Sequence, residues 1–383
     1  MPGRLTAWKN KLSGGRLIET VMRVGLVIYG SLETISGGFL YDRKLVEHLR
    51  SQGDEVTLVS LPWRNYLRHL GDNISPRLEN KLRQLEVDVL IEDELNHPSL
   101  VWVNRRMQGL KRYPVISIVH HLRSSEAFPA WQRRAYAWVE QCYLASQDGF
   151  IFNSQTTRRS VEQMRTGLSG LPWVVAYPSG DRFQAVISPA EITQRALEKG
   201  HLRLVFIGNL IERKGLHYLI SALAVLPKHA WQLNVIGRMD VDPRYTWRIR
   251  RLVKAKGLQD KIQFMGPLDQ DQLAAQIRQG HLLAVPSSYE GFGIVYLEGM
   301  GFGLPAIAGS QGAAGEVITH AQDGFLVDPE NVQEFARTIA ELANDRHVLA
   351  RMGQAARQRY LAHPTWQQSM QAVRDFLIQV VNR

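Results

Sequence analysis

Short apolar runs alternate along the chain with longer amphipathic stretches. The first run, VGLVIYG, is followed by a glycine-bearing turn and by LYDRKLVEHLRSQG, and Gly53 separates that stretch from the next run, EVTLVSL. Apolar runs of this length predict buried strands, and apolar residues spaced three and four positions apart predict a helix. A glycine after such a helix is a stop signal. The pattern therefore predicts a repeated unit of strand, turn and helix.

The same unit recurs in two series that are separated by a polar stretch. The strand-sized runs of the first series continue with VDVLIE, VISIVHH, GFIFNS and WVVAYPS, and those of the second are LRLVFIG, WQLNVIG, KIQFMG, HLLAVPS, LPAIAG and GFLVD. Strands that alternate with helices form parallel sheets, and ligands bind at the carboxyl ends of such strands. We therefore predict an α/β protein with two Rossmann-like domains that face each other across a cleft.

The two series also set the expected domain boundaries. Residues 1–21 form a basic N-terminal extension, residues 22–185 the first domain, residues 186–200 a polar linker, and residues 201–363 the second domain. Residues 364–383 have helical periodicity, and we expect this helix to pack back on the first domain. No run approaches the roughly 20 apolar residues that a transmembrane helix requires.

The composition adds a strong positive charge. The 383 residues include 46 Lys and Arg against 36 Asp and Glu, which gives a net charge of +10. Such a charge suits a phosphorylated substrate, an anionic membrane surface or nucleic acid. Basic and aromatic residues occur together in SLPWRNYLRHLGDN and WQRRAYAWVE, which suits an anionic lipid surface or nucleic acid, and the alternative is a solvated amphipathic helix. Cys142 is the only cysteine, so we expect a reducing, cytoplasmic location, with possible peripheral contact to the inner face of the membrane.

The stretch EGFGIVYLE in the second series carries the strongest chemical signal. It begins at Glu290, passes through Phe292 and Gly293, and enters an apolar segment at Ile294 that contains Glu298. A helix that begins after a strand and a glycine turn has free N–H groups at its start, and these bind an anion such as phosphate. Carboxylates beside a phosphate favour sugar hydroxyls, so Glu298 suits a ribose and Glu290 suits a hexose. The alternative is a surface helix with two solvated glutamates.

A second motif, GNLIERKG, follows strand LRLVFIG. Arg213 and Lys214 lie at the carboxyl end of this strand and open a helix. Two cations at this position can neutralise a diphosphate leaving group as its charge develops. The alternative is a solvated helix start, although cations at a helix N-terminus oppose the helix dipole.

Three features of the first domain are expected to face the cleft. Gly37 and Gly38 follow the first strand and allow a ligand to approach the backbone closely, but their spacing is not the G-x-G-x-x-G of a nicotinamide dehydrogenase. His120 or its neighbour His121 ends another strand and can hydrogen-bond a sugar hydroxyl. The acidic run at residues 92–94 either faces an acceptor hydroxyl or forms a solvated turn.

Together these motifs resemble the retaining glycosyltransferases of family 4, which have the two-domain GT-B architecture. The resemblance covers nearly everything from Met22 onward and rests on the E-x7-E spacing of EGFGIVYLE, on ERKG and on the early SGG. It implies that Glu298 holds the nucleotide ribose, that Glu290 lies beside the donor sugar and that Lys214 contacts the diphosphate. It also implies that His120 lies near the sugar.

The resemblance extends to backbone positions and has one clear departure. It implies that the amides of Phe292, Gly293 and Ile294 meet the sugar and the diphosphate, and that Gly38 falls in the loop on the phosphate side. The family often has Gly-Arg where this chain has Gly-Asn209, so we expect Arg213 to replace the missing arginine.

We therefore predict the retaining transfer of a hexosyl group from a UDP-, GDP- or ADP-sugar to a hydroxyl of a glycan, a lipid or a small metabolite, without a metal ion or other cofactor. The expected catalytic residues are His120, Arg213, Lys214 and Glu290, and the expected donor contacts are Gly37, Gly38, Asn209, Phe292, Gly293, Ile294 and Glu298. The alternatives are another GT-B enzyme, such as a sugar-nucleotide epimerase or a glycosyl phosphorylase, and a non-catalytic nucleotide-sugar binding protein. Asp240 and Asp242 have no evident third ligand for a metal, and a nucleic-acid partner is not expected.

Overall fold

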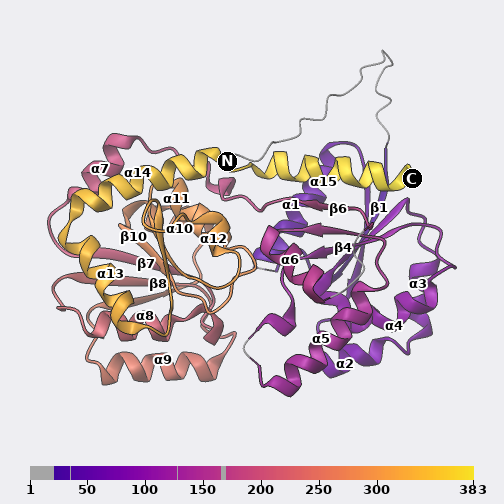
Figure 1. Cartoon of the computed structure of the whole chain (residues 1–383), viewed down its shortest axis with the longest axis horizontal. Helices are drawn as coiled ribbons and strands as arrows, with labels where there is room; N and C mark the ends of the chain where they lie inside the picture. Colours follow the sequence, from indigo (N-terminus) through magenta and orange to yellow (C-terminus); the bar gives the residue numbers. More distant parts are fainter. Residues whose placement is uncertain (1–20, 35, 127, 165–169) are drawn as a thin grey trace, which may run out of the picture.

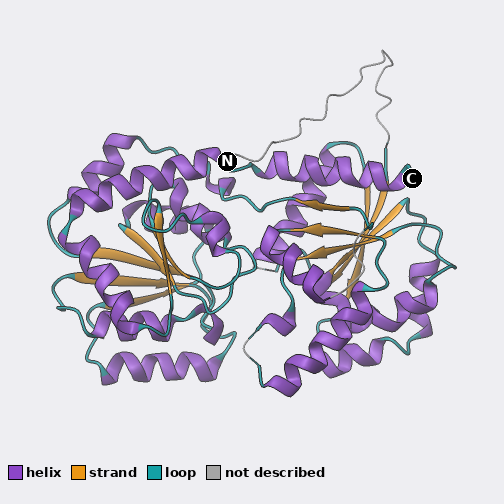
Figure 2. Cartoon of the chain, viewed as in Figure 1, coloured by secondary structure: helices purple, strands orange, loops and turns teal. Residues whose placement is uncertain are grey.

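The computed structural model describes residues 21–34, 36–126, 128–164 and 170–383. The predicted basic extension lies outside these residues, apart from Val21. The described chain forms two α/β domains, each built on a parallel sheet with helices on both faces (Figures 1 and 2). This confirms the fold class that the alternating pattern predicts.

The first domain contains a six-stranded sheet in the order β2-β1-β3-β4-β5-β6, and all its strand pairs are parallel. Strands β3 to β5 are buried along their whole length, as expected for strands covered by helices on both faces. The elements are β1 (Arg23–Tyr29), α1 (Gly37–Ser51), β2 (Glu55–Leu61), α2 (Tyr66–Asp72), α3 (Pro76–Arg83), β3 (Val89–Asp93), α4 (His97–Met107), β4 (Val115–Val119), α5 (Ala130–Leu144), β5 (Gly149–Phe152), α6 (Gln155–Met164) and β6 (Trp173–Val175).

The second domain repeats this architecture with the strand order β12-β11-β10-β7-β8-β9, again with parallel pairs only. One continuous apolar core joins its sheet to the covering helices. The elements are β7 (Leu202–Ile207), α8 (Leu216–Ala224), β8 (Trp231–Ile236), α9 (Pro243–Ala255), β9 (Ile262–Gly266), α10 (Gln270–Gln279), β10 (Leu282–Val285), α11 (Ile294–Gly301), β11 (Ala306–Gly309), α12 (Ala314–Val317), β12 (Gly324–Val327), α13 (Val332–Asn344) and α14 (Arg346–Ala362).

The stretch expected to be a linker contains a helix that belongs to the second domain. Helix α7 (Pro189–Leu197) begins with a capping box in which Ser188 and Glu191 satisfy each other's backbone N–H groups, and it packs against α14. The buried guanidinium of Arg195 donates to the carbonyl of Gly303 at 2.9 Å. Polar composition suggested an open connection, but these tertiary contacts order it.

The C-terminal helix returns to the first domain. Helix α15 (Trp366–Val381) lies along α1, as Figure 1 shows, and Trp366 packs edge-to-face on Tyr41. Arg374 forms an ion pair with the buried Asp54 at 2.7 Å. The chain therefore crosses between the domains twice. Among the described residues, no helix is both long and apolar enough to span a bilayer.

The two domains meet where α6 begins. The backbone N–H groups of Gln155 and Thr156 donate to the carboxylate of Glu316, at 2.9 and 2.6 Å, and Ser154 Oγ donates to the carbonyl of Gly291 at 3.0 Å. A carboxylate at the N-terminus of a helix is stabilised by the helix dipole. This contact holds the loop that begins at Glu290 close to the carboxyl end of β4.

Candidate functional site

The loop between β10 and α11 carries the donor-side residues that the sequence singled out. Gly293 adopts a left-handed backbone conformation, with φ of 94°, and a Cβ at this position would lie 2.4 Å from the ring of Tyr296. Only glycine fits both conditions. Helix α11 begins at the next residue, Ile294, which is where the sequence predicted it to begin. Its start therefore faces the loop that holds Glu290.

Glu290 is buried within a group of hydrogen-bond donors and cations. Its Oε1 contacts Lys214 Nζ and accepts from Ser287 Oγ at 2.6 Å, and its Oε2 lies 3.5 Å from Arg213 Nη1. Burial raises the pKa of this carboxyl, but the nearby cations lower it by a larger amount. The resulting pKa is about 2, below the ordinary value of a glutamate. Burial lowers the pKa of Lys214. The two predicted cations and one predicted carboxylate thus form a single cluster.

The position of this cluster depends on close backbone approach. Gly215 has φ of 69°, and a Cβ there would lie 2.0 Å from the carbonyl oxygen of Pro286. The carbonyl of Arg213 accepts from the N–H of Ser288 at 2.9 Å. The loop that carries Lys214 is therefore fixed directly against the loop that carries Glu290.

The second predicted carboxylate, Glu298, is held by an arginine that the sequence reasoning missed. Arg182 Nε lies 2.5 Å from Glu298 Oε1, and the Glu298 side chain is buried. Gly180 makes this approach possible, because a Cβ there would lie 2.7 Å from the Cβ of Leu297. A ribose that binds Glu298 must share the carboxylate with Arg182 or displace it. The sequence offers one signal for it, because Arg182 lies in SGDRF, where the regular alternation of strands and helices ends after WVVAYPS.

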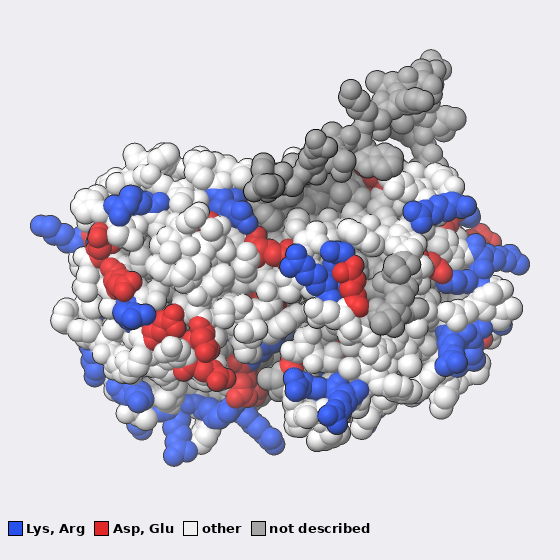
Figure 3. Space-filling model, in the orientation of Figure 1, with Lys and Arg blue, Asp and Glu red and all other residues white. Residues whose placement is uncertain are grey.

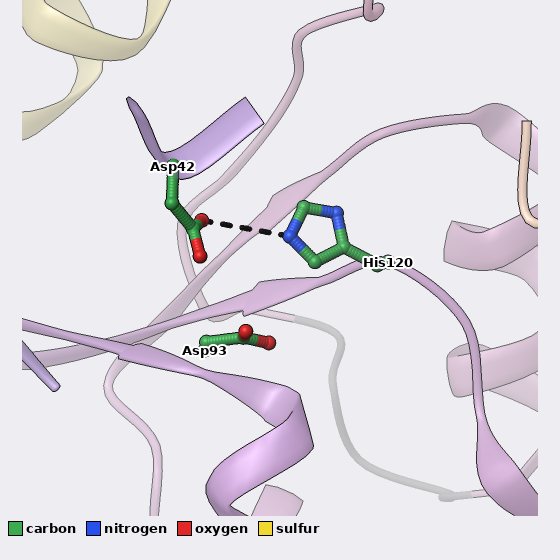
Figure 4. Close-up of side chains that lie close together, drawn as sticks. All are labelled: Asp42, Asp93 and His120. Carbon is green, nitrogen blue, oxygen red and sulfur yellow. Dashed lines mark ion pairs between the residues drawn. The ribbon is translucent and has the colours of Figure 1, made fainter. Parts of the chain in front are cut away.

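On the first domain, the side chain of His120 meets Asp42 and Asp93, as Figure 4 shows. His120 Nε2 lies 3.5 Å from Asp42 Oδ1, and both carboxylates are buried. Burial lowers the pKa of His120, but hydrogen bonding to Asp42 and the charge of Asp93 raise it more, so its pKa lies above the ordinary value. Burial and repulsion from Asp42 raise the pKa of Asp93. Asp42 lies on α1 and was not among the predicted residues.

The glycine pair lies beside this histidine. A Cβ on Gly38 would lie 3.2 Å from the His120 ring, and a Cβ on Gly37 would lie 3.6 Å from Cδ1 of Ile294 in the other domain. Gly37 and Gly38 are the first residues of α1, which Ser36 caps through a hydrogen bond to the N–H of Phe39. The structure therefore brings the glycine pair, His120 and the start of α11 together.

His121 points elsewhere. Its Nε2 lies 2.9 Å from Glu126 Oε1, and its ring lies 6.4 Å from that of Tyr289, measured between centroids. Of the two neighbouring histidines, His120 is the one that joins the buried acidic cluster.

The acidic run at residues 92–94 is buried, so the expectation of a solvated turn is wrong. Glu92 accepts from Asn104 Nδ2 at 2.8 Å, and Glu94 lies 3.0 Å from His97 Nδ1. Burial raises the pKa of both glutamates to about 7. Glu94 and His97 form a second group with Glu140 in which potential metal-ligand atoms lie within 4.8 Å of one another.

Two members of that second group, Glu140 and His97, are already bonded to other protein groups. Ser124 donates from its N–H and its hydroxyl to Glu140, and His97 Nε2 lies 3.0 Å from the hydroxyl of Tyr66. Burial lowers the pKa of His97 to about 4. The group is therefore best described as a buried hydrogen-bond network beside the carboxyl end of β3.

Two other predicted positions have structural partners. Asn209 Oδ1, in the loop after β7, accepts from the N–H of Arg238 in the loop after β8 at 3.4 Å. The ring of Phe292 packs against Tyr177 and His363. Asp242 caps α9 through the N–H of Tyr245, which accounts for this acidic residue without a metal.

Comparison with solved structures identifies the fold. Sucrose-phosphate synthase from Thermosynechococcus elongatus superposes with a TM-score of 0.81 at 20% identity, over 94% of this chain and 99% of that one. Anabaena HepE in complex with UDP and glucose superposes with a TM-score of 0.72 at 20% identity, over 93% and 99% of the two chains. The fold of this chain is therefore the GT-B fold.

Sequence comparison finds similarity to a known family in one domain. Residues 188–359, which include α7 and most of the second domain, match the family described as Glycosyl transferases group 1. A GDP-mannose-dependent alpha-(1-6)-phosphatidylinositol monomannoside mannosyltransferase of Mycobacterium tuberculosis is 30% identical over 240 residues, which are 60% of this chain and 61% of the relative. A D-inositol 3-phosphate glycosyltransferase of Pseudarthrobacter chlorophenolicus is 28% identical over 45% of this chain and 42% of the relative. The chain thus spans at most about three fifths of these two relatives.

Proposed function

We propose that this protein is a retaining glycosyltransferase of family 4 that moves a hexosyl group from a nucleotide-diphosphate sugar to an acceptor hydroxyl. One observation carries the proposal. Lys214, Arg213 and Glu290 form a charged cluster at the loop leading into α11, and the next residue of that loop, Gly291, lies against His120 of the other domain. The cations and the N-terminus of α11 can stabilise the negative charge of a departing diphosphate. The imidazole of His120 lies on the opposite side, where the sugar would bind.

The proposed reaction breaks the bond between the anomeric carbon and the diphosphate oxygen. The bonding electrons leave with the diphosphate, and Lys214, Arg213 and the amides of residues 292–294 stabilise the charge that develops there. The acceptor oxygen bonds to the anomeric carbon on the face that the diphosphate leaves, and its proton passes to the departing phosphate. Because the protein supplies these cations, we propose that no metal ion is required.

The remaining predicted residues orient the donor. Glu298 accepts hydrogen bonds from the ribose, Glu290 from the hexose, and His120 donates to a sugar oxygen, as charged groups do in tight polar sites. The names of the two curated relatives mention inositol-based molecules, so inositol phosphates and phosphatidylinositol are the first acceptors to test. We further propose a cytoplasmic location.

The test is product analysis with a panel of UDP-, GDP- and ADP-sugars, with and without acceptor. We expect one donor to give a glycoside with the anomeric configuration of the donor, measured by NMR, and the same rate after addition of EDTA. An inverted product or loss of activity in EDTA contradicts the mechanism. Donor epimerisation without an acceptor, cleavage of a glycoside by phosphate to a sugar 1-phosphate, or binding without turnover supports one of the rival functions instead.

A glycine at the domain contact gives a further prediction. A Cβ on Gly291 would lie 2.4 Å from the carbonyl oxygen of His120, so Gly291→Ala should push the two domains apart. We expect at least a tenfold loss of turnover, because misplacing reacting groups by about 1 Å can cost a hundredfold. Gly71→Ala is the control, since a Cβ there meets nothing within 4 Å. Equal activity of the two variants, with equal melting temperatures, contradicts this role of the contact.

A further inference from the structure

Helix α9 presents a cationic face that includes a tryptophan. Tyr245, Ile249 and Val253 on its other side are buried in the core of the second domain. The helix contains no acidic residue. Its exposed side carries residues at spacings of three and four, which we call the α9 stripe: Arg244, Trp247, Arg248, Arg251 and Lys254.

Most of the charge on the α9 stripe is available to a partner. Arg248 forms an ion pair with Glu212 at 2.9 Å, but Arg244, Arg251 and Lys254 form none with any other residue in the described ranges. The Trp247 side chain is 60% exposed, and the Arg251 guanidinium lies over its ring at 5.3 Å from the centroid. A solvated helix face does not require an exposed indole, whereas an interfacial helix uses one.

A groove adjoins the α9 stripe. It has a volume of about 760 Å³ and is lined by Glu212, Asp242, Pro243, Arg244, Trp247 and Arg248. Arg248 in this lining is paired with Glu212, so the groove offers the cation of Arg244 beside the Trp247 indole to an anionic headgroup with an apolar neighbour.

The first domain has a matching surface. On α5, Trp131 and Trp138 lie seven positions apart and are 72% and 56% exposed, and Arg133 and Arg134 between them are exposed as well. Figure 1 places α9 at the lower edge of one domain and α5 with α2 at the lower edge of the other. Figure 3 shows Lys and Arg gathered at this edge of both domains.

We propose that this edge, formed by the α9 stripe and the exposed face of α5, docks the protein on an anionic phospholipid bilayer. The tryptophans enter the interfacial region while the cations contact headgroup phosphates. The exposed indoles lie on separate helices of two domains, and the groove beside the α9 stripe is lined by Glu212 and Asp242 as well as by arginines. A single-stranded nucleic acid would instead need a continuous basic groove that tracks its backbone. The proposal goes beyond glycosyl transfer, because membrane binding is measured without turnover.

The test is co-sedimentation of the full-length protein with vesicles of phosphatidylcholine alone or mixed with phosphatidylglycerol. We expect binding only to the mixed vesicles, and weaker binding at higher salt. The triple variant Arg244→Gln, Arg251→Gln, Lys254→Gln should bind about a hundredfold more weakly, since each cation near such a surface contributes about fivefold. Trp247→Ser and Trp131→Ser should each weaken binding as well.

The control variant removes the same charge elsewhere on the second domain. Lys199→Gln, Arg337→Gln, Arg351→Gln neutralises three exposed cations outside the α9 stripe and should bind like wild type. If both triple variants lose binding equally, net charge is responsible and the proposed surface is wrong. Absence of binding to mixed vesicles overturns the proposal. It is also overturned if the protein binds heparin or DNA through the α9 stripe and does not bind the vesicles. Turnover of soluble acceptors should be unchanged in the α9 variant, so failure of docking remains distinct from failure of the proposed function.

Discussion

Lys214→Ala is expected to lower kcat by about a hundredfold, the scale on which removal of one preorganised charge donor acts. Lys214 Nζ is the cation in direct contact with Glu290, and in the proposed reaction it turns to the departing diphosphate. The fold should persist, because Glu290 keeps Ser287 and Arg213 as partners. Steady-state kinetics with the identified donor, together with a melting curve, measures both effects.

The control for this variant is a lysine with a purely local bond. Lys228 Nζ donates to the carbonyl of Gly257 at 2.8 Å on the surface, so Lys228→Ala should leave kcat unchanged. Lys214→Arg should recover part of the rate, because it restores the charge but not the geometry of the ammonium. Turnover of Lys214→Ala close to that of wild type, with donor bound, would mean that the leaving group is stabilised elsewhere.

Asp42→Asn is expected to lower kcat about tenfold or more near neutral pH and to change its pH dependence. Asp42 Oδ1 forms an ion pair with His120 Nε2 at 3.5 Å, and we expect its loss to cost about 1.5–3 kcal/mol, the scale of a polar contact to a charged group. The pKa of His120 is raised in the wild-type protein, so a rate that depends on its imidazolium is lost as pH rises through that raised value. Without the Asp42 charge the pKa falls, and the same loss occurs at a lower pH.

The pH profile separates this role from simple damage to the fold. Asp42→Asn should regain activity as the pH is lowered, whereas a structural defect lowers the rate equally at every pH. His120→Ala should abolish the loss of rate that occurs as pH rises through the pKa of His120. His121→Ala should retain this pH dependence, because His121 pairs with Glu126 outside the cluster. A profile for Asp42→Asn that is parallel to that of wild type contradicts the assignment.

Much of the architecture followed from local pattern. Apolar runs and amphipathic stretches predicted the strands and helices of both sheets, and the glycine turn predicted that α11 begins at Ile294. These features depend on residues close together in sequence, whose spacing reports directly which side chains face the core. The prediction of a linker at residues 186–200 was wrong because local pattern does not report distant contacts. The polar exposed side of α7 resembles a linker, and the contact with α14 that orders this helix cannot be read from neighbouring residues.

The chain by itself determined the two α/β units and the order of the motifs, because strand and helix periods are written in neighbouring residues. Only the tertiary structure decided that Arg182 lies on Glu298, that Lys214 pairs with Glu290 and that Asp42 faces His120. Each of these pairs joins residues that are far apart in sequence. For Glu290, burial raises the pKa of the carboxyl, and the charges of Lys214 and Arg213 lower it more. The distances between these side chains cannot be read from the sequence pattern. They are set by the fold, which brings the loops at the carboxyl ends of parallel strands to one edge of each sheet.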